Sequence, residues 1–393
     1  MRRMWAVIGL SVLLWMVWPW GSAPGGLPFA AARAETLQEA VSRQISSMDL
    51  GALTQAAEGQ DLLPKDIPGL IRALVSGQTV LDGAALWGWL GRKVTGTFQS
   101  SLWRMTRLLA PALLLGVLSH LRASLGREFV AKACNYAGML LVMGFLVADM
   151  NEHAQLARAA ITGMSSTMQA LFPFLVTLLA AVGGRASAAF FQPAVVAASG
   201  TMTTLLQNVT LPFAMGLGVL TMVGSLCDNL RITKLCKLMK QVAHWTLGFG
   251  FTVFIGVMMV QGLGSAAVDG VSIRTAKYAI DNFIPIVGGM FADTVDTLVG
   301  CSLLIKNAVG IVGLFLLLGQ LMGPMLQTVC TLILYSAASA VLEPVADSPL
   351  SQCIGEFSGV YTLLFIIELS VGAMFMLLVA QMLVVGNLTV MLR

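Results

Sequence analysis

Charge is scarce in this chain. Only 11% of its 393 residues are Asp, Glu, Lys or Arg, whereas 57% are hydrophobic. Soluble domains carry about 25% charged residues, so this set is too small to cover a water-facing surface. The apolar excess, with a mean hydropathy of +0.84, must therefore face lipid. The composition predicts an all-α fold, a polytopic bundle of transmembrane helices.

The sequence also lacks the motifs of common enzymes. It contains no HExxH, GxSxG or Walker A sequence, and its three histidines lie far apart. None of the six cysteines belongs to a CxxC pair, so no metal or redox motif is visible. The basic residues form no dense run, so the net charge of +4 does not indicate nucleic acid. We expect no enzyme, no cofactor and no metal site.

The N-terminus has the parts of an export signal. The pair Arg2-Arg3 precedes an apolar run, and an Ala-x-Ala site follows at 32–34. We predict a cleavable signal peptide at 1–34; an uncleaved anchor helix is the alternative. Cleavage would leave an extracytoplasmic helical region at 35–101 and a polytopic membrane domain at 102–393.

Nine apolar runs follow the extracytoplasmic region. A helix needs about 20 residues to cross the hydrocarbon core, so about seven to nine spans are expected. The runs lie at 102–121, 133–149, 171–183, 186–206, 209–227, 245–263, 307–326, 327–342 and 360–386.

Loop charges predict the orientation of these spans. The 122–132 and 228–244 segments are rich in Lys and Arg, so the positive-inside rule places both in the cytoplasm. The 149–168 segment is mixed and 343–359 is acidic, so both are expected outside. This alternation gives a multi-pass protein of the cell membrane, with an external N-terminus after cleavage and a cytoplasmic C-terminus.

The 228–244 segment also shows helical spacing. Its apolar residues Ile232, Leu235, Met239 and Val242 recur on one face, and its lysines lie mostly elsewhere. This pattern favours a helix lying on the inner leaflet and held by anionic lipid. A docking site for a cytoplasmic partner is the alternative.

The segment 277–313 is neither an ordinary loop nor a clean span. It breaks at a proline and places small residues and two carboxylates on one helical stripe. Carboxylates are costly in lipid, so a re-entrant hairpin lining a polar cavity is one interpretation. The other is an external amphipathic helix whose acids are solvated. The candidate residues are Pro285, Gly288, Gly289, Asp293, Asp296, Gly300, Lys306 and Asn307.

A second broken stretch, 171–199, suggests another re-entrant hairpin. It is interrupted by Gly183-Gly184-Arg185. If both hairpins enter from outside, Arg185 could pair with Asp293 or Asp296.

Glu368 is a further candidate, because it is a carboxylate in the middle of an apolar run. It is either a proton or ion site or a polar contact to a neighbouring helix through Ser or Asn.

The residues from Asn282 to Gly313, which include NFIPIVGG and SLLIKNAVGIVG, are the most specific pattern in the chain. Together with the signal peptide and the C-terminal GNLTVMLR, they resemble the stage III sporulation protein AE family of endospore-forming Firmicutes. The similarity runs across nearly the whole chain. That family assigns no catalytic residue.

The resemblance implies a core or permease-like component of an export apparatus in the mother-cell membrane around the engulfed forespore. It implies three kinds of partner: a cytoplasmic secretion-type ATPase, other stage III sporulation membrane proteins, and ring-forming proteins between the membranes. A self-contained secondary transporter, with Asp293, Asp296 and Glu368 as ion sites, is the alternative function.

Overall fold

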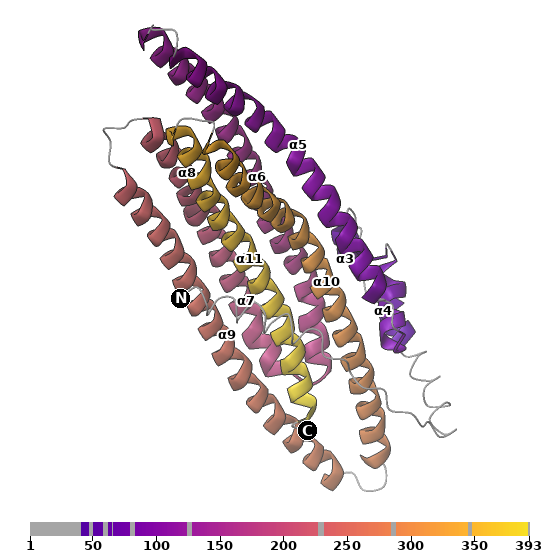
Figure 1. Cartoon of the computed structure of the whole chain (residues 1–393). Coiled ribbons are helices and arrows are strands. Elements are labelled where there is room, and N and C mark those ends of the chain that lie inside the picture. The colour runs from indigo at the N-terminus through magenta and orange to yellow at the C-terminus, as the bar shows by residue number, and fades with distance from the viewer. Residues whose placement is uncertain are drawn as a thin grey trace.

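In a computed structural model, the protein forms an elongated bundle of long helices (Figure 1). It describes residues 41–46, 50–57, 62–64, 66–78, 83–123, 128–226, 232–283, 288–344 and 348–391. The predicted signal peptide lies outside these residues. The described part contains helices and turns and no strand.

A short helical segment at 41–46 comes first, and long helices make up most of the remainder. The elements are α3 (Gly51–Ala57), α4 (Ile67–Val75), α5 (Gly83–Ala123), α6 (Glu128–Ala181), α7 (Arg185–Leu205), the π-helical turn η1 (Leu206–Thr210), α8 (Leu211–Leu226), α9 (Thr233–Phe283), α10 (Gly288–Leu342) and α11 (Ser348–Met391).

Among the described residues, five helices are long and apolar enough to cross a membrane, which confirms the predicted helical membrane fold. These candidate spans are Tyr136–Ala181, Arg185–Leu226, Thr233–Gly262, Thr297–Leu342 and Leu350–Met391.

The structure joins several of the nine apolar runs. The runs 307–326 and 327–342 are one stretch of α10, and η1 links 186–206 to 209–227. The expected external loop at 149–168 is the middle of α6, so that expectation is wrong. Polar residues lower the local hydropathy there, but the backbone hydrogen bonds of the helix continue, because they do not depend on whether a side chain is polar.

Contacts between distant residues fix the direction of each helix. α10 and α11 are antiparallel, since Gly310 lies against Leu383 while Ser339 donates to the Ser351 carbonyl at 2.9 Å. α9 and α11 run parallel, with Lys240 beside Gly359. From α5 to α11 successive rods alternate in direction, with α7, η1 and α8 forming one rod (Figure 1).

This alternation sorts the helix ends into two groups. At the α8–α9 end lie Ala123, Glu128, Leu226, Thr233, Leu342 and Ser348; at the α6–α7 end lie Ala181, Arg185, Phe283, Gly288 and Met391 (Figure 1). The charge-based orientation placed 343–359 on the opposite side from 122–132 and 228–244. The helix ends that flank all three segments instead meet at the α8–α9 end. Counting 307–326 and 327–342 as two crossings caused this mismatch.

The described part of the amphipathic segment 228–244, from residue 232 onward, also differs from its prediction. Residues from Thr233 onward are the first turns of α9, a helix of 51 residues, rather than a separate helix lying along the membrane. Leu235 is 47% exposed, so the apolar face of this segment is not buried within the chain.

Both predicted breaks fall near their expected positions. Gly183 has a φ of +103°, which only glycine adopts readily, and it turns the chain between α6 and α7. The second break separates α9 from α10, and Pro285 lies there, outside the described residues. The arms are long, however: α6 has 54 residues and α10 has 55. Both hairpins therefore join full-length helices rather than short half-inserted ones.

Glycines allow the central helices to pack closely. A Cβ on Gly313 of α10 would lie 2.2 Å from Leu171 of α6, and one on Gly372 of α11 would lie 2.2 Å from Leu321 of α10. Small residues at helix contacts are typical of membrane bundles. The N-terminal helices α3 and α4 pack against α6 and α10 and bury Leu53, Ile67 and Ile71 completely.

Candidate functional site

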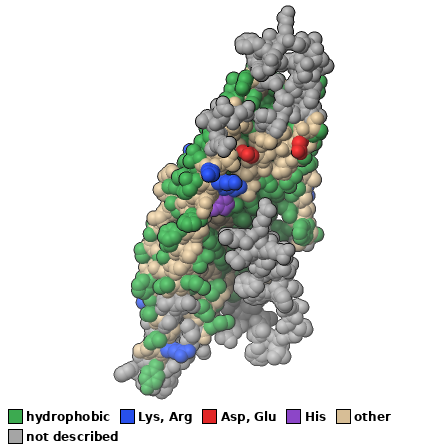
Figure 2. All heavy atoms as spheres, turned by 60° about the vertical axis from the view of Figure 1, so that its left-hand side comes forward, with side chains coloured by type: hydrophobic (Ala, Val, Ile, Leu, Met, Phe, Trp, Pro, Cys, Tyr) green, Lys and Arg blue, Asp and Glu red, His purple; other side chains and the backbone are tan. Residues whose placement is uncertain are grey.

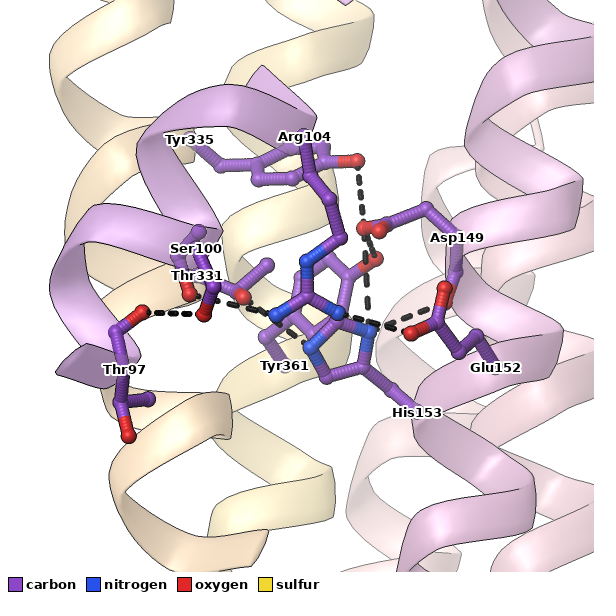
Figure 3. Close-up of polar contacts among 10 residues, drawn as sticks. Thr97, Ser100, Arg104, Asp149, Glu152, His153, Thr331, Tyr335 and Tyr361 are labelled. Carbon is purple, nitrogen blue, oxygen red and sulfur yellow. Dashed lines mark hydrogen bonds and ion pairs between the residues drawn. The ribbon is translucent and has the colours of Figure 1, made fainter. Parts of the chain in front are cut away.

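A buried polar cluster joins four helices in the interior of the bundle (Figure 3). At its centre is Asp149 of α6, whose Oδ2 accepts hydrogen bonds from two tyrosines. Tyr335 of α10 donates at 2.8 Å and Tyr361 of α11 at 2.6 Å. Both tyrosines are almost fully buried. Two O–H donors on one oxygen compensate a carboxylate for the water that it has lost.

His153 extends the cluster one turn along α6. Its Nδ1 lies 2.9 Å from the carbonyl oxygen of Asp149, and because a carbonyl only accepts, Nδ1 carries a proton. Its Nε2 lies 3.0 Å from the hydroxyl of Thr331 on α10. In the neutral imidazole Nε2 accepts from that hydroxyl. The ring also packs edge-on against Tyr361, with centroids 5.0 Å apart.

Arg104 brings α5 into the cluster. Its Nη1 lies 3.0 Å from Glu152 of α6, and its Nη2 donates to Ser101 at 3.2 Å. With its amide oxygen turned toward the guanidinium, Gln327 of α10 accepts from both nitrogens at 2.6 and 2.9 Å. Arg104, which lies within the apolar run 102–121, thus bridges three helices.

A cavity of about 180 Å³ opens onto this cluster. Its polar lining comes mainly from Arg104, Arg107, Asp149, Glu152 and Tyr335. The cavity therefore places both signs of charge beside the half-buried Asp149 carboxylate. It has the size for several water molecules or a small polar ligand.

Glu368 lies two helical turns beyond Tyr361 on α11 and is fully buried. Thr328 of α10 donates to its Oε1 at 3.1 Å, while its Oε2 has no hydrogen-bond partner among the described residues. Thr328 is one turn from Thr331, so the polar path continues along the α10–α11 contact. The neighbouring-helix contact is made by a threonine rather than by the Ser or Asn considered from the sequence.

Lys306 and the C-terminal motif meet at the other end of the same helix pair. The Lys306 side chain is fully buried, and its Nζ donates to the Leu383 carbonyl at 3.0 Å. It lies over Gly386, where a Cβ would be 1.8 Å from Nζ. The Oδ1 atoms of Asn307 and Asn387 are buried there without a partner among the described residues. Two separate sequence motifs thus form one contact.

The remaining candidates are not brought together by the described side chains. Arg185 is the exposed first residue of α7. Gly288, Gly289, Asp293 and Asp296 lie in the first turns of α10, but the described side chains do not include theirs, so pairing with Arg185 stays a prediction. Gly300 is half-buried with open space around its Cα.

A carboxylate that the sequence did not single out holds the start of α7. Asp269 of α9 accepts from the backbone N–H groups of Ala186 at 2.8 Å and Ser187 at 2.9 Å. It is 2% exposed. Asp269 therefore caps a helix that begins about 80 residues earlier in the chain.

Sequence reasoning also missed the centre of the polar cluster. Asp149 lies in the segment 149–168, which the loop charges place outside, and His153 lies far from the other two histidines in the sequence. Their i, i+4 spacing on one helix face, and the spacing of Thr328, Thr331 and Tyr335 on α10, are signals that could have identified the cluster. Within the described ranges, no group of three His, Cys, Asp or Glu side chains could hold a metal ion.

Comparison with known proteins relates this chain to one family. The family model described as stage III sporulation protein AE matches residues 65–386. The chain is also 30% identical over 380 residues to stage III sporulation protein AE of Bacillus subtilis (strain 168), covering 94% of each sequence. This chain belongs to the stage III sporulation protein AE family. No solved structure matches it.

The region matched by the stage III sporulation protein AE family contains both the polar cluster and almost all residues of the candidate spans. Every cluster residue, from Arg104 to Glu368, falls inside the matched region. The five candidate spans fall almost entirely inside it as well. The protein is thus a sporulation membrane protein whose family-wide region contains a buried polar core.

Proposed function

We propose that this protein is a membrane-embedded, permease-like core component of a mother cell-to-forespore export apparatus that is needed after engulfment. The observation that carries the proposal is the family relationship across residues 65–386. The geometry supports a conduit role, because hydrogen-bonded polar residues from α5, α6, α10 and α11 converge beside a cavity that opens to the surface of the bundle.

The proposal includes partners that supply what this chain lacks. The sequence contains no nucleotide-binding motif, so energy would come from a cytoplasmic secretion-type ATPase. Other stage III sporulation membrane proteins and ring-forming proteins between the two membranes would complete the assembly. The site of action would be the mother-cell membrane around the forespore.

Deletion of the gene in a sporulating host tests this function. Forespores should complete engulfment and then arrest, and the wild-type chain should restore heat-resistant spores. A tagged chain, purified from sporulating cells, should bring down the ATPase and the other membrane components. Normal spores after deletion, or a chain recovered alone, would overturn the proposal.

A self-contained secondary transporter is the second candidate, favoured by the fully buried carboxylate Glu368 and the half-buried Asp149. Intramembrane carboxylates often bind protons or cations in transporters. Purified protein in vesicles with an imposed proton or sodium gradient separates the two candidates. The export-component proposal expects no coupled uptake by this chain alone, and coupled uptake abolished by Glu368→Gln would favour the transporter.

A further inference from the structure

The outer face of α9 carries a basic patch at the α8–α9 end. Lys234, Lys237 and Lys240 are all exposed in its first turns. Figure 2 shows Lys or Arg side chains beside a His side chain on this side of the molecule, with an Asp or Glu side chain and hydrophobic surface next to them. The exposed Glu356 of α11 lies near Cys236, the residue before Lys237. In the described part of the chain, none of the three lysines forms an ion pair with a carboxylate.

Two of the basic side chains and a histidine form one stripe. Lys237, Lys240 and His244 recur at i, i+3 and i+7, so they share a face of the helix. The His244 Nδ1 donates to the carbonyl of Lys240 at 2.6 Å, which leaves Nε2 for an outside partner. Lys240 rests beside Gly359 of α11, whose missing side chain gives the ammonium room.

Directly after this stripe, α9 becomes an exposed apolar surface. Trp245 is 72% exposed, Phe249 74% and Val260 76%. From 241 to 268 the helix contains no Asp, Glu, Lys or Arg. At 1.5 Å per residue this stretch is about 40 Å long, enough to cross the roughly 30 Å of hydrocarbon. Tryptophan favours the boundary between hydrocarbon and headgroups.

We propose that Lys237, Lys240, His244 and Trp245 bind the headgroup phosphate of an anionic phospholipid. The occupant follows from the order of residues along α9, read from the middle of the helix toward its start. An apolar stretch without charged residues comes first, then Trp245, then lysines that form no ion pair within the described part of the chain. Lipid phosphate supplies the complementary charge there, and the acyl chains cover Phe249 and Val260. This site does not depend on the export function.

Quenching of Trp245 by brominated lipid tests the site. Full-length protein is reconstituted into phosphatidylcholine vesicles that contain either brominated phosphatidylcholine or brominated phosphatidylglycerol at equal mole fraction. The chain has eight tryptophans, so the Trp245 signal is the difference between wild type and Trp245→Phe. Stronger quenching by brominated phosphatidylglycerol is expected. A lysine near an anionic surface contributes about five-fold in affinity, so Lys237→Gln/Lys240→Gln should lose most of this preference.

Two matched variants control the experiment. Arg72→Gln/Arg92→Gln removes equal charge from exposed positions on α4 and α5 and should leave the preference unchanged. Lys237→Arg/Lys240→Arg should retain it, which keeps the test decisive if the glutamine variant fails to fold. Equal quenching by both lipids in wild type would overturn the phosphate site. Absence of quenching by either lipid would show that protein, not lipid, covers this face.

Discussion

Asp149 is the residue on which the buried cluster converges. Its Oδ2 accepts from Tyr335 and Tyr361, its backbone carbonyl accepts from His153, and its carboxylate borders the cavity. A buried acceptor that loses a donor keeps its desolvation cost. Stability at this point therefore depends on single hydroxyl groups from two other helices.

Removing one of these hydroxyls gives the first prediction. Tyr361→Phe should lower the free energy of unfolding by about 2 kcal/mol, because a hydrogen bond to a charged group is lost inside the bundle. Unfolding in mixed micelles, followed by circular dichroism, measures the change. Tyr136→Phe is the control, since Tyr136 is 54% exposed on α6. Equal stability of the two variants would contradict the role assigned to Tyr361.

The contact between Lys306 and Gly386 gives the second prediction. Gly386→Ala should cost about 1 to 3 kcal/mol, because the new methyl displaces a fully buried side chain. Gly300→Ala is the matched control: nothing lies within 4 Å of its added Cβ. That substitution should be neutral or stabilise α10 by about 0.5 to 1 kcal/mol. Thermal unfolding of both variants in detergent measures these changes in stability. An equal change in the two variants would contradict the close contact between Lys306 and Gly386.

At the scale of elements, the start of α7 depends on a distant residue. Asp269→Ala should cost about 1 to 2 kcal/mol and leave two backbone N–H groups without an acceptor. Hydrogen–deuterium exchange should accelerate in peptides covering the first turn of α7. Asp66→Ala removes a local cap, which accepts from Gly69 at 3.0 Å, and should affect only α4. Unchanged exchange at α7 would show that the cap does not hold the turn.

The sequence predicted that the chain forms helices, but it did not predict how long each helix is. Apolar runs and the breaks near Gly183 and Pro285 were sufficient to place hairpins between helices. Hydropathy could not reveal that α6 continues through 149–168, because Asp149, Glu152 and His153 pair with residues of α5, α10 and α11 that are distant in the sequence. Partners on other helices are long-range information, which a single periodic pattern does not carry.

Three buried charged residues illustrate the same limit. Glu368 was recognised as a buried carboxylate because it interrupts an apolar run. Asp269 was not, because its role depends on a helix start about 80 residues away. Lys306 was noted within a motif, but its placement over Gly386 required the antiparallel register of α10 and α11.

For the whole molecule, the order of the rods predicts which segments share a side of the membrane. In a background without the six native cysteines, cysteines replace Thr233, Glu343, Arg185 and Met391 one at a time. Positions 233 and 343 should react with an impermeant thiol reagent from one side, and 185 and 391 from the other, because each rod connects opposite ends. Labelling of vesicles of known orientation measures this.

The alternative orientation makes the opposite prediction. The orientation predicted from the loop charges places 343 and 233 on opposite sides of the membrane, because it counts the two apolar runs of α10 as two crossings. Joint labelling of 343 with 185 would therefore support that orientation and contradict a single crossing by each rod.

The unbroken length of α6 has a mechanical consequence. Its 54 residues form a rod of about 80 Å, and the Asp149 cluster, the wall of the cavity and the approach to the Gly183 turn all belong to it. Pro173 lies inside α6 between the cluster and that turn, and it removes one backbone hydrogen bond there. A tilt of α6 between Glu128 and Pro173 would therefore carry the polar cluster with it, and Pro173 is the point at which the rest of the helix can bend.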